Sequence, residues 1–144
     1  MRKIIAAINT TIDGFCDHTA GLPDEEIHEH YTNLLKGAGL ILYGRITYQL
    51  MQYWQTLVHT PSGEKSMDDF AVSIDHIPKM VFSRSLKDTQ WHNAKLADQP
   101  LGEMVGELKR QSGGDILIGS RSLIVELTNL DLIDEYQLCI HPVV

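Results

Sequence analysis

The sequence predicts an α/β domain built on a largely parallel sheet. Short apolar runs alternate with segments whose apolar residues recur at helical spacing, which is typical of strands joined by helical crossovers. The run at 40–43 is apolar on both faces, as a parallel strand covered by helices on both sides would be. Because the chain has 144 residues, we expect residues 1–144 to form a single domain with a full hydrophobic core.

The first half of the chain contains two predicted strands and three predicted helices. The helix after Pro23 begins with acidic residues, which suit the positive end of a helix dipole, and ends at Lys36-Gly37. A loop at 59–65 contains Pro, Ser and Gly, which interrupt regular structure. In order, the elements are a strand at 3–8, a helix from 23 to 36, a strand at 40–43, a helix through 48–52 and a short helix at 68–74.

The second half contains the clearest helix of the sequence. Its apolar residues fall at i, i+3, i+4 and i+7, and it lies between Pro100 and a Gly-Gly pair. We interpret this apolar face as core rather than as a binding surface. The elements predicted here are a strand at 79–82, a helix at 101–108, a strand at 115–118, a helix at 122–129 and a strand at 136–143.

Composition excludes several classes of protein. With 12 Lys plus Arg against 19 Asp plus Glu, the net charge of -7 argues against binding nucleic acid through bulk charge. No apolar run approaches the roughly 20 residues of a membrane span, and the apolar N-terminal run is too short for a signal peptide. The two cysteines form no metal or disulfide pattern, and the histidines show no ligand spacing. We therefore expect a cytoplasmic protein without a metal site.

Three of the five arginines directly follow predicted strands. Arg45, Arg84 and Arg121 each have a Ser or Thr within two positions. Ligands of open α/β sheets bind beyond the carboxyl ends of the strands, where arginine and hydroxyl groups suit phosphates. Two of these loops also lead into predicted helix N-termini, which attract anions. The pattern favours a ligand with several phosphates over the alternative of ordinary surface arginines, although neither a P-loop nor a Rossmann fingerprint is present.

Four stretches of the sequence resemble a known superfamily. Residues 7–14, 43–48 and 81–86 are similar to the dihydrofolate reductase-like superfamily. Residues 113–123, continued by 132–136, resemble the C-terminal reductase domain of the bifunctional deaminase–reductase of riboflavin biosynthesis and its stand-alone relatives. The resemblance implies a dihydrofolate reductase-like three-layer α/β/α sandwich with a mostly parallel central sheet.

The resemblance also implies an NADPH-dependent reductase of a small pteridine- or pyrimidine-like heterocycle. Ala7 and Gly14 would flank the nicotinamide. The residues implied to bind the adenosine phosphate end are Gly44, Arg45, Thr47, Ser83 and Arg84. Those implied to bind the pyrophosphate are Gly119, Ser120, Arg121, Ser122 and Leu123. A nucleotide-binding protein without turnover is the main alternative, and a flavin-binding or interacting protein is a weaker one.

The residues expected to bind the substrate match these families less closely than the cofactor-binding residues do. No tryptophan follows Leu22-Pro23, as it would in folate reductases. His30-Tyr31 and Leu34-Leu35 stand where the riboflavin-pathway enzymes carry Asp-Val and Leu-Arg, so an acid and an arginine for the substrate phosphate are missing. The candidate catalytic residues are Asp13, Asp24 and His30, and the alternatives are His28 and Glu25. Asp13 could instead form a turn before Gly14, and Asp24 and Glu25 could instead be first-turn acids of the helix.

The predicted last strand bears on assembly. The chain stops at residue 144, where the family usually continues through a glycine-rich turn and further strands. We therefore expect either that the last C-terminal strands are missing or that another subunit completes the sheet edge, since an open edge strand invites pairing. A homodimer is expected.

Overall fold

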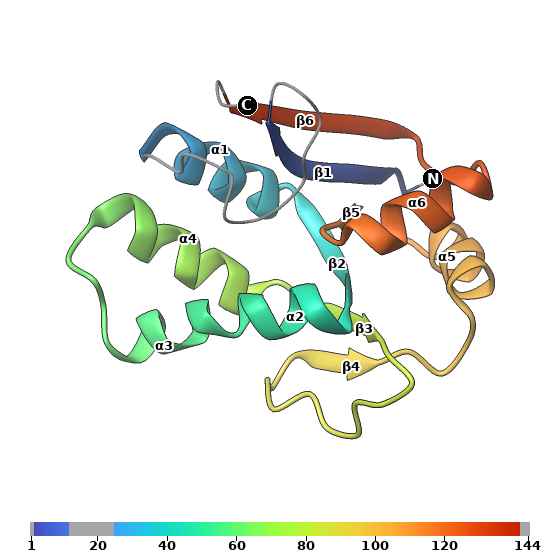
Figure 1. Cartoon of the computed structure of the whole chain (residues 1–144), viewed down its shortest axis with the longest axis horizontal. Helices are drawn as coiled ribbons and strands as arrows, with labels where there is room; N and C mark the ends of the chain where they lie inside the picture. The colour runs from blue at the N-terminus through green and yellow to red at the C-terminus, as the bar shows by residue number, and fades with distance from the viewer. Residues whose placement is uncertain (1, 12–24, 142–144) are drawn as a thin grey trace.

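A computed structural model of the chain describes residues 2–11 and 25–141. These residues form one six-stranded sheet with helices packed on both faces (Figure 1). The elements are β1 (Ile4–Thr11), α1 (Glu25–Lys36), β2 (Ala38–Gly44), α2 (Arg45–Met51), α3 (Tyr53–His59), α4 (Lys65–His76), β3 (Lys79–Phe82), β4 (Ala94–Leu96), α5 (Leu101–Arg110), β5 (Asp115–Ile118), α6 (Arg121–Asn129) and β6 (Glu135–His141).

The strands lie in the order β4-β3-β2-β5-β1-β6, and each neighbouring pair is parallel. The prediction of a largely parallel sheet is therefore confirmed. Residues 40–44 of β2 are all buried, as expected for a central strand that is covered on both faces.

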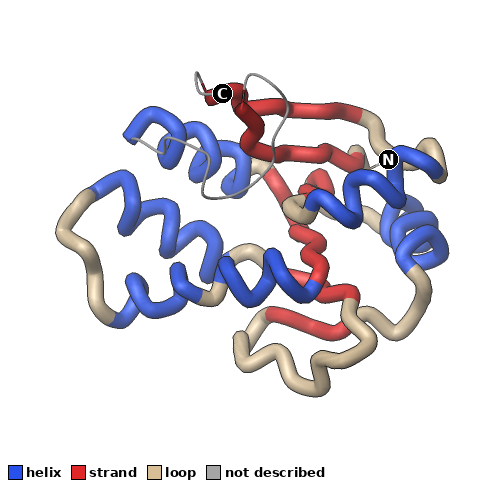
Figure 2. Tube along the Cα trace, in the orientation of Figure 1, coloured by secondary structure: helices blue, strands red, loops and turns tan. Residues whose placement is uncertain are grey.

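Two separate cores place the helices in layers on either side of the sheet. One core packs α1, α2 and α4 against the sheet through residues such as Leu35, Tyr48 and Phe70. The other packs α5 and α6 through residues such as Val105 and Leu127. Figure 2 shows the strands running between these two groups of helices. The predicted three-layer α/β/α sandwich is confirmed.

Two elements were not predicted. β4 has only three residues and lies at the sheet edge, so it is too short to show an alternating pattern. α3 follows α2 after a break at Gln52, and its half-buried Trp54 and buried Leu57 pack the helix inward. The helix predicted at 68–74 begins earlier, at Lys65. The strand predicted at 136–143 begins at Glu135, and its last two residues lie outside the described part.

The sheet changes winding direction between β2 and β5. The chain leaves β2 for α2 on one face, whereas it leaves neighbouring β5 for α6 on the opposite face. Such a topological switch point opens a crevice at the carboxyl ends of the two strands, where α/β proteins bind their ligands. The loops that begin with Gly44-Arg45 and Gly119-Ser120 flank this crevice.

Candidate functional site

A buried hydrogen bond joins the two loops that flank the crevice. The backbone N–H of Gly44 donates to Ser120 Oγ at 2.7 Å, and Ser120 is only 1% exposed. A Cβ atom added to Gly44 would lie 3.3 Å from Ser122 Oγ, so a side chain there would press on the start of α6. The ends of β2 and β5 are thus fixed against each other.

The same hydrogen bond leaves the start of α6 without a side-chain cap. Ser120 is the N-cap residue of α6, yet its hydroxyl makes no bond to the helix's own N–H groups. The first N–H groups of α6 can therefore serve an anionic ligand, beside the exposed side chains of Arg121 and Ser122. The N-terminus of α2 is a weaker anion-binding site than the sequence suggested, because this helix has only seven residues and hence a weak dipole.

Two adjoining cavities open beside this crevice. The larger has a volume of about 640 Å³ and lies between the sheet and α1–α4. The smaller, of about 200 Å³, lies where Arg45 and Phe82 meet the start of α6. Thr47 and Ser122 line both cavities. A long ligand that passes these two hydroxyl groups could occupy both spaces.

The predicted cofactor residues divide between the cavities. Those that line the larger are Ala7, Thr47, Gly119, Arg121 and Ser122. Those that line the smaller are Gly44, Arg45, Thr47, Ser122 and Leu123. Ser120 lines neither cavity, and its hydroxyl accepts the Gly44 N–H and so holds the two loops together. Gly14 lies outside the described residues.

Ser83 and Arg84 line neither cavity. Ser83 Oγ accepts the backbone N–H groups of Ser85 and Leu86, at 3.2 and 3.0 Å, and so stabilises its own turn. Arg84 is exposed. Their strand, β3, lies next to β2 but one position farther from the crevice than β5 does. Both residues follow the carboxyl end of a strand, as the sequence predicted, but the strand order sets them apart from the crevice.

The catalytic candidates fall outside the cavity or outside the described residues. Asp13 and Asp24 are among residues that the structure does not describe. His30 is exposed, stacks edge-on against Tyr31 at 5.3 Å and does not line the cavity. His28 lines it instead, with its ring 5.7 Å from that of Trp54 and its Nδ1 buried without a hydrogen-bond partner.

Sequence reasoning missed a polar pair in the cavity wall. The Tyr31 hydroxyl donates to Asn9 Oδ1 at 2.9 Å, and both residues line the larger cavity. Burial raises the pKa of the Tyr31 phenol, which therefore stays protonated at neutral pH. Asn9 could have been noticed, since it is a polar residue at the end of the first apolar run. Trp54 both packs against the core and lines the cavity.

Gly119 shapes the floor of the larger cavity. A Cβ atom at this position would lie 2.8 Å from Cε1 of Tyr43, which is closer than real contacts allow. Tyr43 is 2% exposed, so its ring has little room to move away. Glycine therefore lets the backbone after β5 pass directly over the Tyr43 ring, which explains part of the Gly-Ser motif by packing.

Comparison with known proteins places the chain in a family. Residues 2–144 match the model described as "RibD C-terminal domain". The chain belongs to this family. A protein of Bacillus subtilis (strain 168), named "Uncharacterized protein YyaP", is 35% identical over 147 residues, which cover 99% of this chain and 76% of that protein. The resemblance to the riboflavin-pathway reductase domain is thereby confirmed.

Solved structures share the fold of this RibD C-terminal domain. A putative riboflavin biosynthesis protein from Shewanella sp. PV-4 has a TM-score of 0.65 at 16% identity, over 99% of this chain and 78% of that one. A pyrimidine reductase-like protein from Corynebacterium diphtheriae has a TM-score of 0.60 at 13% identity, over 99% and 75%. At these identities the likeness concerns the fold alone.

The described residues contain neither a membrane-spanning helix nor a metal-binding cluster. Across residues 2–11 and 25–141, no helix is long and apolar enough to cross a membrane. In the same part of the chain, no three His, Cys, Asp or Glu side chains lie close enough together to hold a metal ion.

Proposed function

We propose that this protein is an NADPH-dependent reductase that transfers hydride to a small pteridine- or pyrimidine-like heterocycle. One observation carries the proposal: the loops after β2 and β5, locked by the Gly44–Ser120 hydrogen bond, flank the switch-point crevice and adjoin a cavity of about 640 Å³. Membership of the RibD C-terminal domain family supports it. The crevice supplies anion-binding groups, and the cavity supplies room for a ring.

The donor set fits a dinucleotide phosphate. Arg121, Ser122 and the uncapped N–H groups of α6 would bind the pyrophosphate, because they offer several donors around one point. Arg45 and Thr47, in the smaller cavity, would bind the further phosphate that distinguishes NADPH from NADH. The nicotinamide would lie in the larger cavity, where bound NADPH supplies a hydride. The chain's own role there is to orient the rings and to keep water away.

A nucleotide-binding protein without turnover is the second candidate. It is favoured by the scarcity of proton-transfer groups at the larger cavity, whose described lining includes His28 and Tyr31 but no carboxylate. A screen of heterocyclic compounds for NADPH oxidation above background separates the two candidates.

Titration with NADPH and NADH tests the cofactor assignment directly. We expect NADPH to bind at least about 10-fold more tightly than NADH, because a phosphate bound by arginine contributes more than 1 kcal/mol. Arg45→Gln should remove most of this preference, whereas Arg84→Gln should leave it unchanged, because Arg84 lines neither cavity. Equal affinity for the two cofactors, or no binding at millimolar concentration, would contradict the proposal.

A further inference from the structure

The side of the larger cavity that faces α1–α4, here called the outer wall, is almost wholly apolar. Its apolar members include Ile27, Leu34, Leu50, Met51, Trp54 and Phe70. Trp54 and Phe70 meet edge-on at 4.6 Å, and the His28 ring lies against both. Such a wall suits a flat ring, because aromatic side chains pack well against planar surfaces. Thr47 is the one predicted cofactor residue among the described residues of this wall, so most of the wall is left for a substrate.

Within the described part of the chain, no Lys or Arg side chain projects from the outer wall. Among the described lining residues, Arg121 is the sole Lys or Arg, and it lies across the cavity at the start of α6. Lys65, at the start of α4, is 87% exposed, binds Asp69 at 2.7 Å and does not line the cavity. Residues 12–24, which lie outside the described part of the chain, contain neither Lys nor Arg.

Burial also disfavours an anion on this wall. The nearby acidic residues of α1, Glu25, Glu26 and Glu29, are exposed and do not line the cavity. An anionic group on the substrate would be removed from water without a charged partner, which is unfavourable. A substrate phosphate or carboxylate therefore has no binding group on this wall.

One polar feature of the cavity points to the group that the substrate carries instead. Asn9 uses its Oδ1 to accept the Tyr31 hydroxyl. Asn9 is exposed and lines the cavity, and its Nδ2 has no acceptor among the described residues, so this donor is free for a ligand. An amide nitrogen can only donate, so it matches a carbonyl oxygen on a ligand.

We infer that the substrate is an uncharged, planar ring compound that bears a carbonyl group and no phosphate. This inference rests on the proposed function, because it names the compound that the reductase would reduce. The ring would gain a hydride on carbon and a proton on oxygen or nitrogen, while NADPH would be oxidised to NADP⁺. His28 or water would supply the proton, and Asn9 would hold the carbonyl oxygen.

The test uses two fluorescent dyes that share one ring system and differ by a single ionised carboxylate group. Diethylaminocoumarin is a flat, neutral, carbonyl-bearing ring, and diethylaminocoumarin carboxylate is the same ring with an ionised group. Each is titrated against the protein in the presence of NADP⁺, which would occupy Arg121 and the start of α6, and is followed by dye fluorescence. We expect the neutral dye to bind at least about 10-fold more tightly than the carboxylate. Equal binding, tighter binding of the carboxylate, or no binding of either dye would overturn the inference.

Matched variants assign any preference to the outer wall. Leu50→Arg places a cation at a lining residue that is 43% exposed, and should reduce or reverse the preference for the neutral dye. Val72→Arg places the same charge at a residue of α4 that is 44% exposed and outside the cavity, and should leave the preference unchanged. Asn9→Leu, which removes the amide donor, should weaken neutral-dye binding several-fold. If Leu50→Arg and Val72→Arg behave alike, the dyes bind elsewhere and the inference fails.

The two proposals can fail separately. A protein that prefers the neutral dye but does not bind NADPH would refute the reductase and keep the ligand class. A protein that binds NADPH but prefers the carboxylate dye would keep the reductase and refute the ligand class.

Discussion

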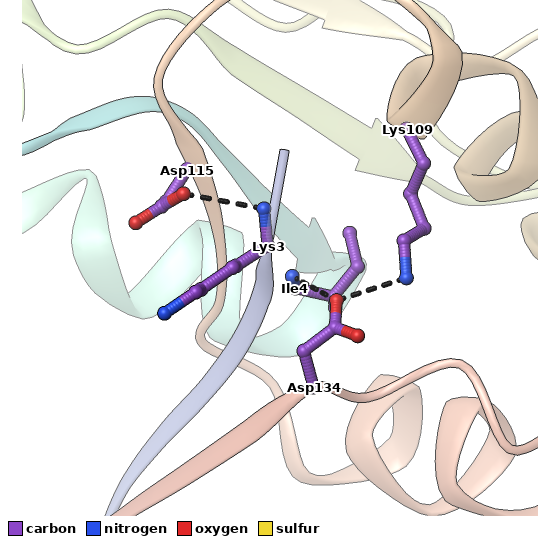
Figure 3. Close-up of polar contacts among 5 residues, drawn as sticks. All are labelled: Lys3, Ile4, Lys109, Asp115 and Asp134. Carbon is purple, nitrogen blue, oxygen red and sulfur yellow. Dashed lines mark hydrogen bonds and ion pairs between the residues drawn. The ribbon is translucent and has the colours of Figure 1, made fainter. Parts of the chain in front are cut away.

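The two ends of the sheet use their polar groups in opposite ways. At the amino end, Asp134 accepts the Ile4 N–H at 2.8 Å and Lys109 Nζ at 2.9 Å, while Asp115 accepts the Lys3 N–H at 3.2 Å (Figure 3). At the carboxyl end, Arg121 has no protein partner within the described part of the chain. Since both ends belong to the same strands, this difference separates the groups that stabilise the fold from those available to a ligand.

The contrast gives each end its own measurable quantity. Removing a paired group at the amino end should lower the free energy of unfolding and leave ligand affinity unchanged. Removing an unpaired group at the carboxyl end should lower ligand affinity and leave the free energy of unfolding unchanged. Ser120, whose hydroxyl is paired but lies at the carboxyl end, should affect both quantities.

The largest effect is expected at Lys79, the first residue of β3. Its side chain is 2% exposed and donates to the Ile77 carbonyl and to Asn93 Oδ1, both at 2.8 Å, and lies 4.1 Å from the centre of the Trp91 ring. Burial lowers the pKa of Lys79 from 10.5 to about 8, although the nearby Asp75 carboxylate opposes the shift. Keeping the Lys79 amine charged in this buried position therefore costs free energy, which its hydrogen-bond partners offset only in part.

This pKa sets the sign of a pH dependence. Between pH 8 and 10.5 the unfolded chain keeps the Lys79 proton that the folded chain has lost, so stability rises with pH in that window. Relative to Lys79→Met, the wild-type free energy of unfolding should increase by roughly 3 kcal/mol across it. Urea denaturation at several pH values measures this. A difference between the two proteins that is constant with pH would contradict the prediction.

Asp134→Ala should destabilise the protein by about 2 kcal/mol, because it removes two hydrogen bonds, one of them to a charged lysine. The hydrogen bond from Lys109, with that from the Ile4 N–H, lowers the pKa of Asp134. Its stabilisation is thus present above the ordinary pKa of 3.8 and is lost as the pH falls through the lower folded value. Asp98→Ala, at an exposed acid, is the control. A loss of NADPH affinity in Asp134→Ala would break the separation of the two ends.

Ser120→Ala should reduce both stability and NADPH affinity. The change leaves the buried N–H of Gly44 without its acceptor, which costs on the order of 1–2 kcal/mol. It also frees the two loops that form the crevice, so affinity should fall several-fold. Ser122→Ala is the comparison, since Ser122 is exposed and should affect affinity while changing stability by less than about 0.5 kcal/mol. Equal stability losses in the two variants would contradict this assignment.

The sequence predicted the layers and the edge of the sheet that carries the site. The apolar pattern located every described strand except β4, and chain order was enough to show that Arg45, Arg84 and Arg121 follow strand ends. Strand order was not readable in this way, because it depends on how distant strands pair. β5 lies beside β2 at the crevice and β3 on the other side of β2, so the three arginines are not equivalent.

The sequence alone also could not predict which way the side chains of the site point. His28 and His30 are two residues apart on α1, so they face different ways, and only packing of α1 against α4 decides that His28 is the one inside. The contact between Asn9 and Tyr31 joins residues 22 positions apart, in β1 and α1, so it depends on how α1 packs against the sheet. An apolar residue such as Trp54 gives the same pattern whether it fills a core or lines a cavity.

The smallest expected effect concerns Arg121, which lies at the crevice, compared with Arg84, which does not. Arg121→Gln should weaken NADPH binding about 10-fold, which corresponds to about 1.4 kcal/mol, because the side chain is exposed and solvent screens its charge. Its free energy of unfolding should stay within about 0.5 kcal/mol of wild type, since no protein group in the described chain depends on it. Arg84→Gln, also exposed but outside both cavities, should change neither quantity. If the two variants lose the same affinity, the arginines act through long-range charge alone, and the crevice between β2 and β5 is not where the phosphates bind.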